Sequence, residues 1–333
     1  MDRRTFMLSM AGGAVGLMAG EPLAGGTSGR EPAKAAGQGK SRVALVRTAD
    51  RTAGVKRAIQ LLGVNPVAGK RVLLKPNFNT ADPFPASTHN DTLTQLIAEL
   101  RGMGAKVITI GERSGPPDTV DVLRDKGIYE LCKRLDVGLI NFEELPPDGW
   151  TKVTPPGSHW NDGFLAARPV LEAECVVVTC CLKTHGYGGV FTMSLKNSVG
   201  IVHKKNMREL HTSFFSQRKM IAEINHAYKP ALILLDGLEA FVDKGPMEGP
   251  KKRAEVILAG TDRIAVDAVG LAILKELGSN KAIMETPIFA QEQIARAVEL
   301  GLGVTEPGAI ELVTDDAASR GYAEKLRQIL AKG

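Results

Sequence analysis

The sequence predicts an α/β protein with a mostly parallel, doubly wound open sheet. Short apolar segments alternate with segments whose apolar residues repeat at helical spacing, from residue 41 almost to the end of the chain. This alternation is typical of strands joined by right-handed crossover helices, which make neighbouring strands parallel. The 333 residues are 44% hydrophobic and 24% charged, an ordinary composition for a globular protein.

The first half of the chain alternates regularly after residue 41. Glycines such as Gly69 and Gly102 separate the segments, and Asn90 or Asp91 is well placed to cap a helix. We expect strands at 42–47, 71–75, 106–110 and 137–141, and helices at 52–62, 91–101, 119–126 and 129–134.

The segment 145–170 interrupts this alternation. Five prolines within it make a long helix implausible. The stretches 151–154 and 163–167 have the length and composition of a pair of short antiparallel strands. We therefore expect a small β insertion near 145–170 rather than a separate domain.

The alternation resumes at Cys175 with an apolar strand. We interpret the polar, glycine-rich run 183–189 as the turn that ends this strand, and the segment 190–202 as the helix that follows it. Further along the chain we expect strands at 231–236, 254–259 and 309–313, and helices at 217–228, 263–277, 287–300 and 318–330.

The start of the chain has the features of an export signal. Arg3 and Arg4 form a twin-arginine pattern, and the mostly apolar run 7–20 that follows is shorter than the about 20 residues that a membrane span needs. Ala33-Lys34-Ala35 offers a cleavage site. We expect a twin-arginine signal peptide and linker at 1–40 and a single α/β domain at 41–333.

That signal predicts the location of the protein. We expect the twin-arginine translocation machinery to export it to the periplasm, and no stable membrane span in the mature chain. The alternatives are an uncleaved membrane anchor and a disordered tail.

Composition argues against two classes of protein. The formal net charge is only +5, aromatic residues make up 5%, and no basic stripe is interleaved with aromatics, so we expect no nucleic-acid partner. None of the four cysteines forms a C-x-x-C pair, so we expect neither a zinc or iron–sulfur site nor a disulfide scaffold.

Polar side chains follow several predicted strands, where ligands bind in open α/β sheets. Lys75 and Asn77 follow one strand, Lys183 and His185 a second, and Asp236 a third. The carboxyl ends of parallel strands share one edge of the sheet, so we expect these side chains to converge there.

Lysines and amides at this edge indicate an anion site. Lys196 and Asn197 lie on the helix predicted after the glycine-rich turn, and helix N-termini favour anions. We expect Lys75, Lys183 and Lys196 to hold the negative charge of a small molecule, and Asn77 and Asn197 to orient it.

The catalytic candidates are Lys183, His185 and Lys196, because a buried lysine or histidine can act as an acid or base. Asp236 and Asp267 complete the predicted ligand-binding set as carboxylate partners. A divalent metal held by His185 and His203 is an alternative, although the spacing matches no compact metal motif. The chain lacks a P-loop, a dinucleotide fingerprint and a G-x-S-x-G motif.

Five groups of residues carry a resemblance to a known family. They are Lys75-Pro76-Asn77, Lys183-Thr184-His185, Ser194-Leu195-Lys196-Asn197 with Gly200, Asp236-Gly237 with Gly245-Pro246 and Gly249, and Thr261-Asp262 with Ala265-Val266-Asp267-Ala268. In these groups the chain resembles the domain of unknown function 362 family. The resemblance implies an α/β domain and supports the location of the site, but it names no reaction.

Some members of that family carry a ferredoxin-like cluster module with many cysteines. This chain has no such run of cysteines, so we expect no iron–sulfur cluster.

The sequence thus favours an exported α/β protein that binds a small anion, with or without a metal, and acts on it as an enzyme. The alternative is a non-catalytic periplasmic accessory protein that binds a metal or metabolite. A structural partner protein is a third hypothesis, and it predicts an exposed apolar patch instead of a ligand site.

Overall fold

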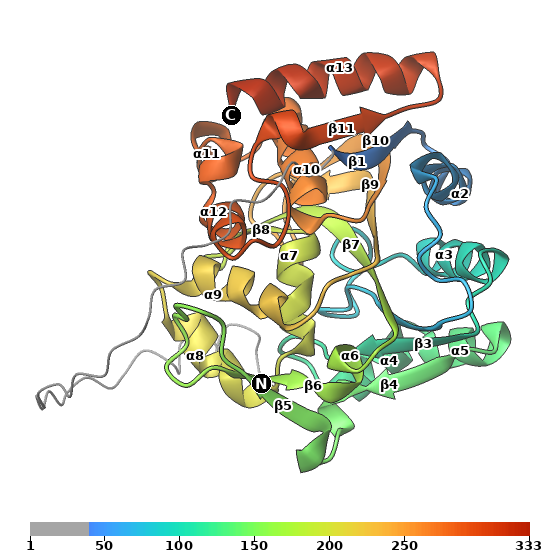
Figure 1. Cartoon of the computed structure of the whole chain (residues 1–333), viewed down its shortest axis with the longest axis vertical. Helices are drawn as coiled ribbons and strands as arrows, with labels where there is room; N and C mark the ends of the chain where they lie inside the picture. Colours follow the sequence, from blue (N-terminus) through green and yellow to red (C-terminus); the bar gives the residue numbers. More distant parts are fainter. Residues whose placement is uncertain (1–39) are drawn as a thin grey trace, which may run out of the picture. The chain divides into compact units, whose positions relative to one another are not determined.

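A sheet of nine strands lies at the centre of residues 40–333, the part of the chain that this computed structural model describes (Figure 1). Its order is β11-β1-β10-β9-β7-β2-β3-β4, and the short strand β8 pairs with the end of β7. The strands are β1 (Ser41–Arg47), β2 (Arg71–Lys75), β3 (Val107–Glu112), β4 (Gly138–Asn141), β7 (Cys175–His185), β8 (Val190–Thr192), β9 (Leu232–Phe241), β10 (Lys251–Gly260) and β11 (Ile310–Val313).

Most neighbouring strands are parallel, which confirms the predicted fold class. Strands β9, β7, β2, β3 and β4 all run in one direction, and β11 runs parallel to β1. Strand β10 is antiparallel to both β1 and β9, which we did not expect. The segment 242–250 between β9 and β10 contains no helix, and a chain that turns back without a crossover pairs antiparallel.

Helices cover both faces of the sheet, and β1 shows how. Ala44 and Val46 pack in one apolar cluster with α2 (Arg51–Leu62) and α3 (Asn90–Gly102). Val43 and Leu45 point to the opposite face and pack in the cluster that includes α10 (Arg263–Leu277) and α13 (Ala317–Lys332). The other helices are α4 (Thr119–Asp125), α5 (Ile128–Leu135), α6 (Arg168–Leu171), α7 (Ser194–Asn197), α8 (Met207–Thr212), α9 (Gln217–Ile224), α11 (Lys281–Glu285) and α12 (Glu292–Glu299).

The β insertion is present where the sequence predicts it. It is a two-stranded antiparallel sheet of β5 (Trp150–Val153) and β6 (Phe164–Ala167). Its aromatic side chains share an apolar cluster with residues of β2, β7 and α9. The insertion therefore covers one face of the main sheet near the strands that carry the predicted site.

The segment 190–202 is not the helix that we expected. Strand β7 continues through Lys183-Thr184-His185, the glycine-rich turn closes a hairpin, and β8 pairs back onto β7. Only then does the one-turn helix α7 begin, and Asp267 accepts hydrogen bonds from the backbone N–H groups of Ser194 and Leu195 at its start. The local sequence could not reveal this partner, because it lies on α10.

The predicted signal peptide lies outside the described residues, apart from Lys40. Among the helices that are described, none combines the length and the apolar composition that crossing a bilayer requires.

Two helical glycines give a test of this packing. Gly54 of α2 faces the sheet, and a Cβ there would lie 2.6 Å from Thr48 Cγ2 and 2.8 Å from Ile257 Cγ1. Gly321 of α13 is exposed, with nothing within 4 Å of the same position. We expect Gly321→Ala to raise the free energy of unfolding by about 0.5–1 kcal/mol through helix propensity. Overpacking should outweigh that gain in Gly54→Ala, for a net loss of about 1–2 kcal/mol.

Urea unfolding of both variants measures the difference. Equal stabilisation by the two substitutions would show that α2 is not packed this closely on β10.

Candidate functional site

Lys75 lies at the carboxyl end of β2 and is buried. Its ammonium group donates to Glu112 Oε1 at 2.5 Å, to the Pro76 carbonyl at 2.7 Å and to Asn197 Oδ1 at 3.3 Å. The structure therefore brings together the ends of β2 and β3 and the helix α7, as the sequence predicts for Lys75 and Asn197. It also gives Lys75 a counter-ion from the protein itself.

Glu112 completes this buried ion pair from the end of β3. Its carboxylate also accepts the backbone N–H of Phe78 at 2.8 Å and of Arg113 at 2.9 Å. Burial lowers the pKa of Lys75 and raises the pKa of Glu112, while their mutual attraction and these hydrogen bonds oppose both shifts. The pair is the most fully satisfied charged group at this edge of the sheet.

The two predicted asparagines differ in how they are held. Asn197 donates from Nδ2 to the Thr179 carbonyl at 3.2 Å, so its amide is fixed against β7. Asn77 is 7% exposed, and its Oδ1 has no hydrogen-bond partner among the described residues. A buried amide oxygen without a partner is costly, so Asn77 is the better placed of the two to meet a ligand.

Lys183 and Lys196 form no ion pair within residues 40–333. Lys183 is fully buried, its ammonium group donates to the Ala86 carbonyl, and burial lowers its pKa to about 8. Lys196 is only partly buried, and it has no hydrogen-bond or ion-pair partner in residues 40–333. Its burial, and then the charges of Lys183 and Arg113, lower its pKa to about 7. Positive charge from Lys183, Lys196 and Arg113 is thus concentrated at this site, and Asp82 offsets part of it at Lys183.

His185 ends β7 and is 7% exposed. The backbone N–H of Gly189 donates to its Nδ1 at 3.3 Å. Burial and the nearby Lys196, His211 and Lys183 hold its pKa well below the usual range, so the ring is neutral. Since Nδ1 accepts a hydrogen bond, the proton of the neutral ring belongs on Nε2.

His185 and Lys196 are neighbours. A Cβ at Gly189 would lie 2.9 Å from His185 Nδ1 and 2.8 Å from Lys196 Cε, so only glycine lets the turn pass between them. Lys183 lies two residues before His185 on β7, and its charge lowers the pKa of both His185 and Lys196.

Arg113 is a residue of this site to which sequence reasoning gave no role. It follows β3 directly and is 3% exposed. Its guanidinium donates to the carbonyls of Ser114 at 2.7 Å and Val199 at 2.5 Å, while Nε has no partner among the described residues. Burial lowers its pKa to about 10. Its place after a buried strand, like that of Lys75, was the signal that could have identified it.

The predicted carboxylates have protein partners instead. Asp236 accepts Arg51 Nε at 2.9 Å and Thr92 Oγ1 at 2.5 Å, which ties α2 and α3 to β9. Asp267 accepts the two N–H groups at the start of α7, and its pKa is raised to about 7 by burial. Their assignment to ligand binding stays a prediction, and both carboxylates position elements that carry the site.

The metal hypothesis also stays a prediction. The ring of His203 packs against Trp150 at 4.6 Å between centroids, and its Nδ1 accepts the backbone N–H of Lys205. Residues 40–333 contain no group of three or more His, Cys, Asp or Glu side chains arranged to hold a metal ion. Elemental analysis of the purified protein tests this hypothesis.

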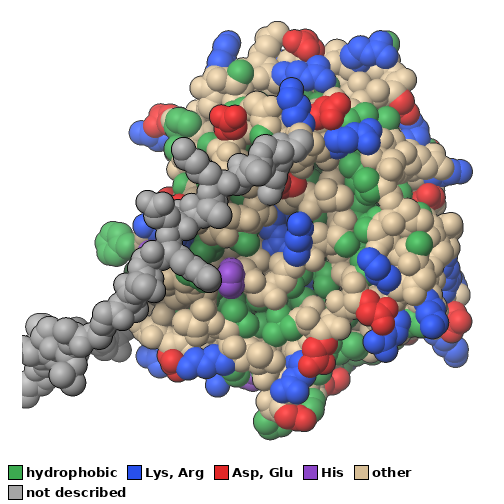
Figure 2. Space-filling view, in the orientation of Figure 1, with side chains coloured by type: hydrophobic (Ala, Val, Ile, Leu, Met, Phe, Trp, Pro, Cys, Tyr) green, Lys and Arg blue, Asp and Glu red, His purple; other side chains and the backbone are tan. Residues whose placement is uncertain are grey.

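Charges of both signs cover the outer parts of the face in Figure 2. Near the middle of this face, a group of Lys or Arg side chains and one His lie among uncharged and hydrophobic atoms (Figure 2). No field of one sign covers the whole face, so any attraction of anions is local to a site.

Comparisons with known proteins identify the family of this chain. The family described as Domain of unknown function (DUF362) matches residues 72–272, a span that contains every predicted site residue. A thylakoid-associated protein of Synechocystis sp. is 27% identical over 256 residues, which cover 74% of this chain and 75% of that protein.

Two solved structures are similar to part of the chain. The lactate racemase apoprotein from Thermoanaerobacterium thermosaccharolyticum is 16% identical, with a TM-score of 0.43 over 61% of this chain. A protein from Thermotoga maritima is 16% identical, with a TM-score of 0.42 over 63% of this chain. The chain spans about half the length of each, 51% and 54%.

The buried ion pair allows a test by double-mutant cycle. We expect Lys75→Met and Glu112→Gln each to lower the free energy of unfolding by about 3–5 kcal/mol, because each leaves an uncompensated or unpartnered group inside the protein. The double variant should lose less than the sum of the two.

Urea unfolding measures all three variants. Lys281→Met breaks the exposed pair with Glu285, whose side chains are 83% and 66% exposed, and should change stability little. Additive losses in the cycle would show that Lys75 and Glu112 do not stabilise each other.

Proposed function

This chain belongs to the DUF362 family, and we propose that its site binds a small anion between Lys183, Lys196 and the Nε2–H group of His185. One observation carries the proposal: the buried Lys183 and the partly buried Lys196 lie near each other, and neither forms an ion pair with a carboxylate within residues 40–333. Buried charge without a partner is costly. An anionic ligand would supply the missing counter-charge.

Arg113 and Asn77 support the same proposal. The charge of Arg113 adds to that of Lys183 at Lys196. The unpartnered oxygen of Asn77 would accept a hydrogen bond from a hydroxyl or protonated group of the ligand. A ligand with a carboxylate or phosphate and a neighbouring donor group suits this set.

The enzymatic form of this proposal rests on Lys196 and His185 lying side by side. A lysine whose pKa is about 7 can take or give a proton near neutral pH, and the neutral His185 presents an N–H donor beside it. In a non-catalytic binding protein the same groups would only hold the ligand. Replacing Lys183 or His185 separates the two, because an enzyme loses turnover whereas a binding protein loses only retention.

Sulfate is a suitable probe, because it keeps its charge between pH 6 and pH 9. Lys196 and Lys183 are protonated below their pKa values of about 7 and about 8, and they lose their charge as the pH rises through both. We expect sulfate to bind about 10-fold or more tightly at pH 6 than at pH 9, since each charge-assisted hydrogen bond contributes about 1.5–3 kcal/mol. Isothermal titration calorimetry measures the affinity.

Lys196→Met should remove most of this pH dependence, while Lys281→Met, on the exposed surface, should leave it unchanged. Without a bound anion, the stability of the protein changes with pH in the opposite direction to the sulfate affinity. The two lysines bind fewer protons folded than unfolded between pH 7 and pH 10, so their contribution to stability rises with pH in that window. A sulfate affinity that is the same at pH 6 and pH 9, and the same in Lys196→Met, would overturn the proposal.

We also propose that the start of the chain directs export by the twin-arginine route. The support is the sequence alone: Arg3 and Arg4 precede the short apolar run 7–20. We expect Arg3→Lys/Arg4→Lys in the full chain to abolish its appearance in the periplasmic fraction, measured by immunoblotting of cell fractions. Export of the double variant at the wild-type level would contradict this proposal.

A further inference from the structure

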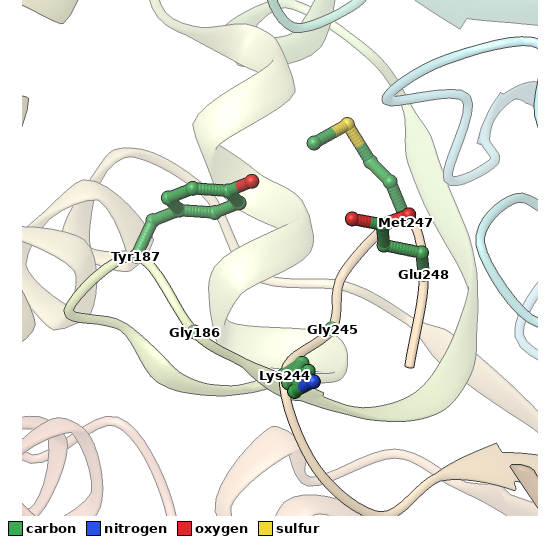
Figure 3. Close-up of a pocket in the computed structure, with 6 residues that line it drawn as sticks. All are labelled: Gly186, Tyr187, Lys244, Gly245, Met247 and Glu248. Carbon is green, nitrogen blue, oxygen red and sulfur yellow. The ribbon is translucent and has the colours of Figure 1, made fainter. Parts of the chain in front are cut away.

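A pocket of about 250 Å³ lies beside the proposed anion site. It is formed by the turn between β7 and β8 and by the loop that follows β9 (Figure 3). Its lining consists of Gly186, Tyr187, Lys244, Gly245, Met247 and Glu248. None of these residues has a role in the anion site itself.

The pocket lies next to His185. Gly186 follows His185 directly, and the rings of His185 and Tyr187 meet edge to face, 5.8 Å apart between centroids. The N–H of Gly186 donates to the carbonyls of Lys244 at 2.5 Å and Gly245 at 3.0 Å, so the turn and the loop are fastened together. A ligand held at Nε2–H of His185 could place a second part against Tyr187 in this pocket.

A buried hydroxyl at the junction lacks a partner. Thr184 is fully buried, and its Oγ1 makes no hydrogen bond within residues 40–333. That oxygen lies 3.2 Å from the position of a Cβ on Gly245, so it faces the pocket loop. A polar atom on the ligand between its charged group and its body would satisfy it.

An aromatic and a thioether side chain, Tyr187 and Met247, form the apolar part of the pocket wall. Figure 3 shows Tyr187 and Met247 extending toward one another from opposite sides of the space. Tyr187 is 45% exposed, which leaves much of its ring surface uncovered. Aromatic faces and the adaptable thioether of methionine both pack well against a flat apolar group.

Volume and charge limit what fits. A cavity of about 150 Å³ can hold benzene, so this pocket has room for one substituted ring, whereas drug-sized ligands occupy about 300–1,000 Å³. Lys244 and Glu248 also line the space (Figure 3), so its wall carries one charge of each sign and offers the anionic end of a ligand no net attraction.

We infer that the ligand is a small organic anion with a flat apolar body of about one ring, and that Tyr187 and Met247 hold this body while Lys196 and His185 hold the anionic group. The inference rests on the proposed function, because it assumes that the anion site exists. It adds the class of ligand, which the cluster of cations alone does not define.

Benzoate and acetate test the inference, because they share a carboxylate and differ by the ring. We expect the wild-type protein at pH 6 to bind benzoate about 10-fold or more tightly than acetate, measured by calorimetry. Tyr187→Ala/Met247→Ala should bring benzoate to within about 3-fold of acetate while sulfate affinity stays unchanged, which shows that the variant is folded. Tyr187→Phe should keep the preference, and Lys196→Met should weaken both carboxylates.

The contrary results are distinguishable. Equal affinities for benzoate and acetate in the wild type, with sulfate bound as expected, would overturn this inference and leave the proposed function standing. A benzoate preference that survives in Tyr187→Ala/Met247→Ala would also overturn it. Failure of sulfate, acetate and benzoate alike to bind would overturn the proposed function together with the inference.

Discussion

The geometry of this edge of the sheet depends on the buried ion pair of Lys75 and Glu112. Burying each charge costs desolvation free energy. The opposite charge and hydrogen bonds from the protein offset that cost. Because the pair joins the end of β2 to the end of β3, the two strands keep a fixed relation where their side chains leave the sheet. Asn197 shares the ammonium group of Lys75, so α7 is held in the same frame.

Lysines with and without a carboxylate partner therefore coexist at this edge of the sheet. Lys75 has a carboxylate, whereas Lys183 has only a backbone carbonyl and Lys196 has no partner in the described chain. A chain under selection for stability alone would supply counter-charges or replace these lysines with apolar residues. Departures from local stability of this kind occur at functional sites, where a ligand or a reaction makes use of the unpaired group.

Hydrophobic spacing and turn residues predicted those helices and strands whose limits depend on the local sequence. The helix at 263–277 and the strand ends at Lys75 and Asn141 follow from spacing and from turn residues. Partners far apart in sequence could not be predicted, since Arg51 and Asp236 are 185 positions apart and yet share a hydrogen bond. The same holds for the site. The ends of the predicted strands indicated where its lysines lie, but only the folded chain shows which lysines have a carboxylate partner.

The hairpin that replaces the expected helix is what connects the charged site to the apolar pocket. The expected helix began only at residue 190, and that prediction did not show that the chain after the turn pairs back onto β7. The turn places Tyr187 in the same pocket lining as Met247. It also brings the N–H of Gly189 to Nδ1 of His185, which sets the tautomer of that ring.

This conformation has a local cost. Val190 pairs with His185 at a φ of 63°, which a β-branched residue rarely adopts and which costs of order 1–3 kcal/mol. Packing of β8 on β7 and of α7 under Asp267 outweighs that cost. The strained residue directly follows Gly189, the point where His185 and Lys196 meet, and strain at such a point is typical of a backbone whose shape serves a site.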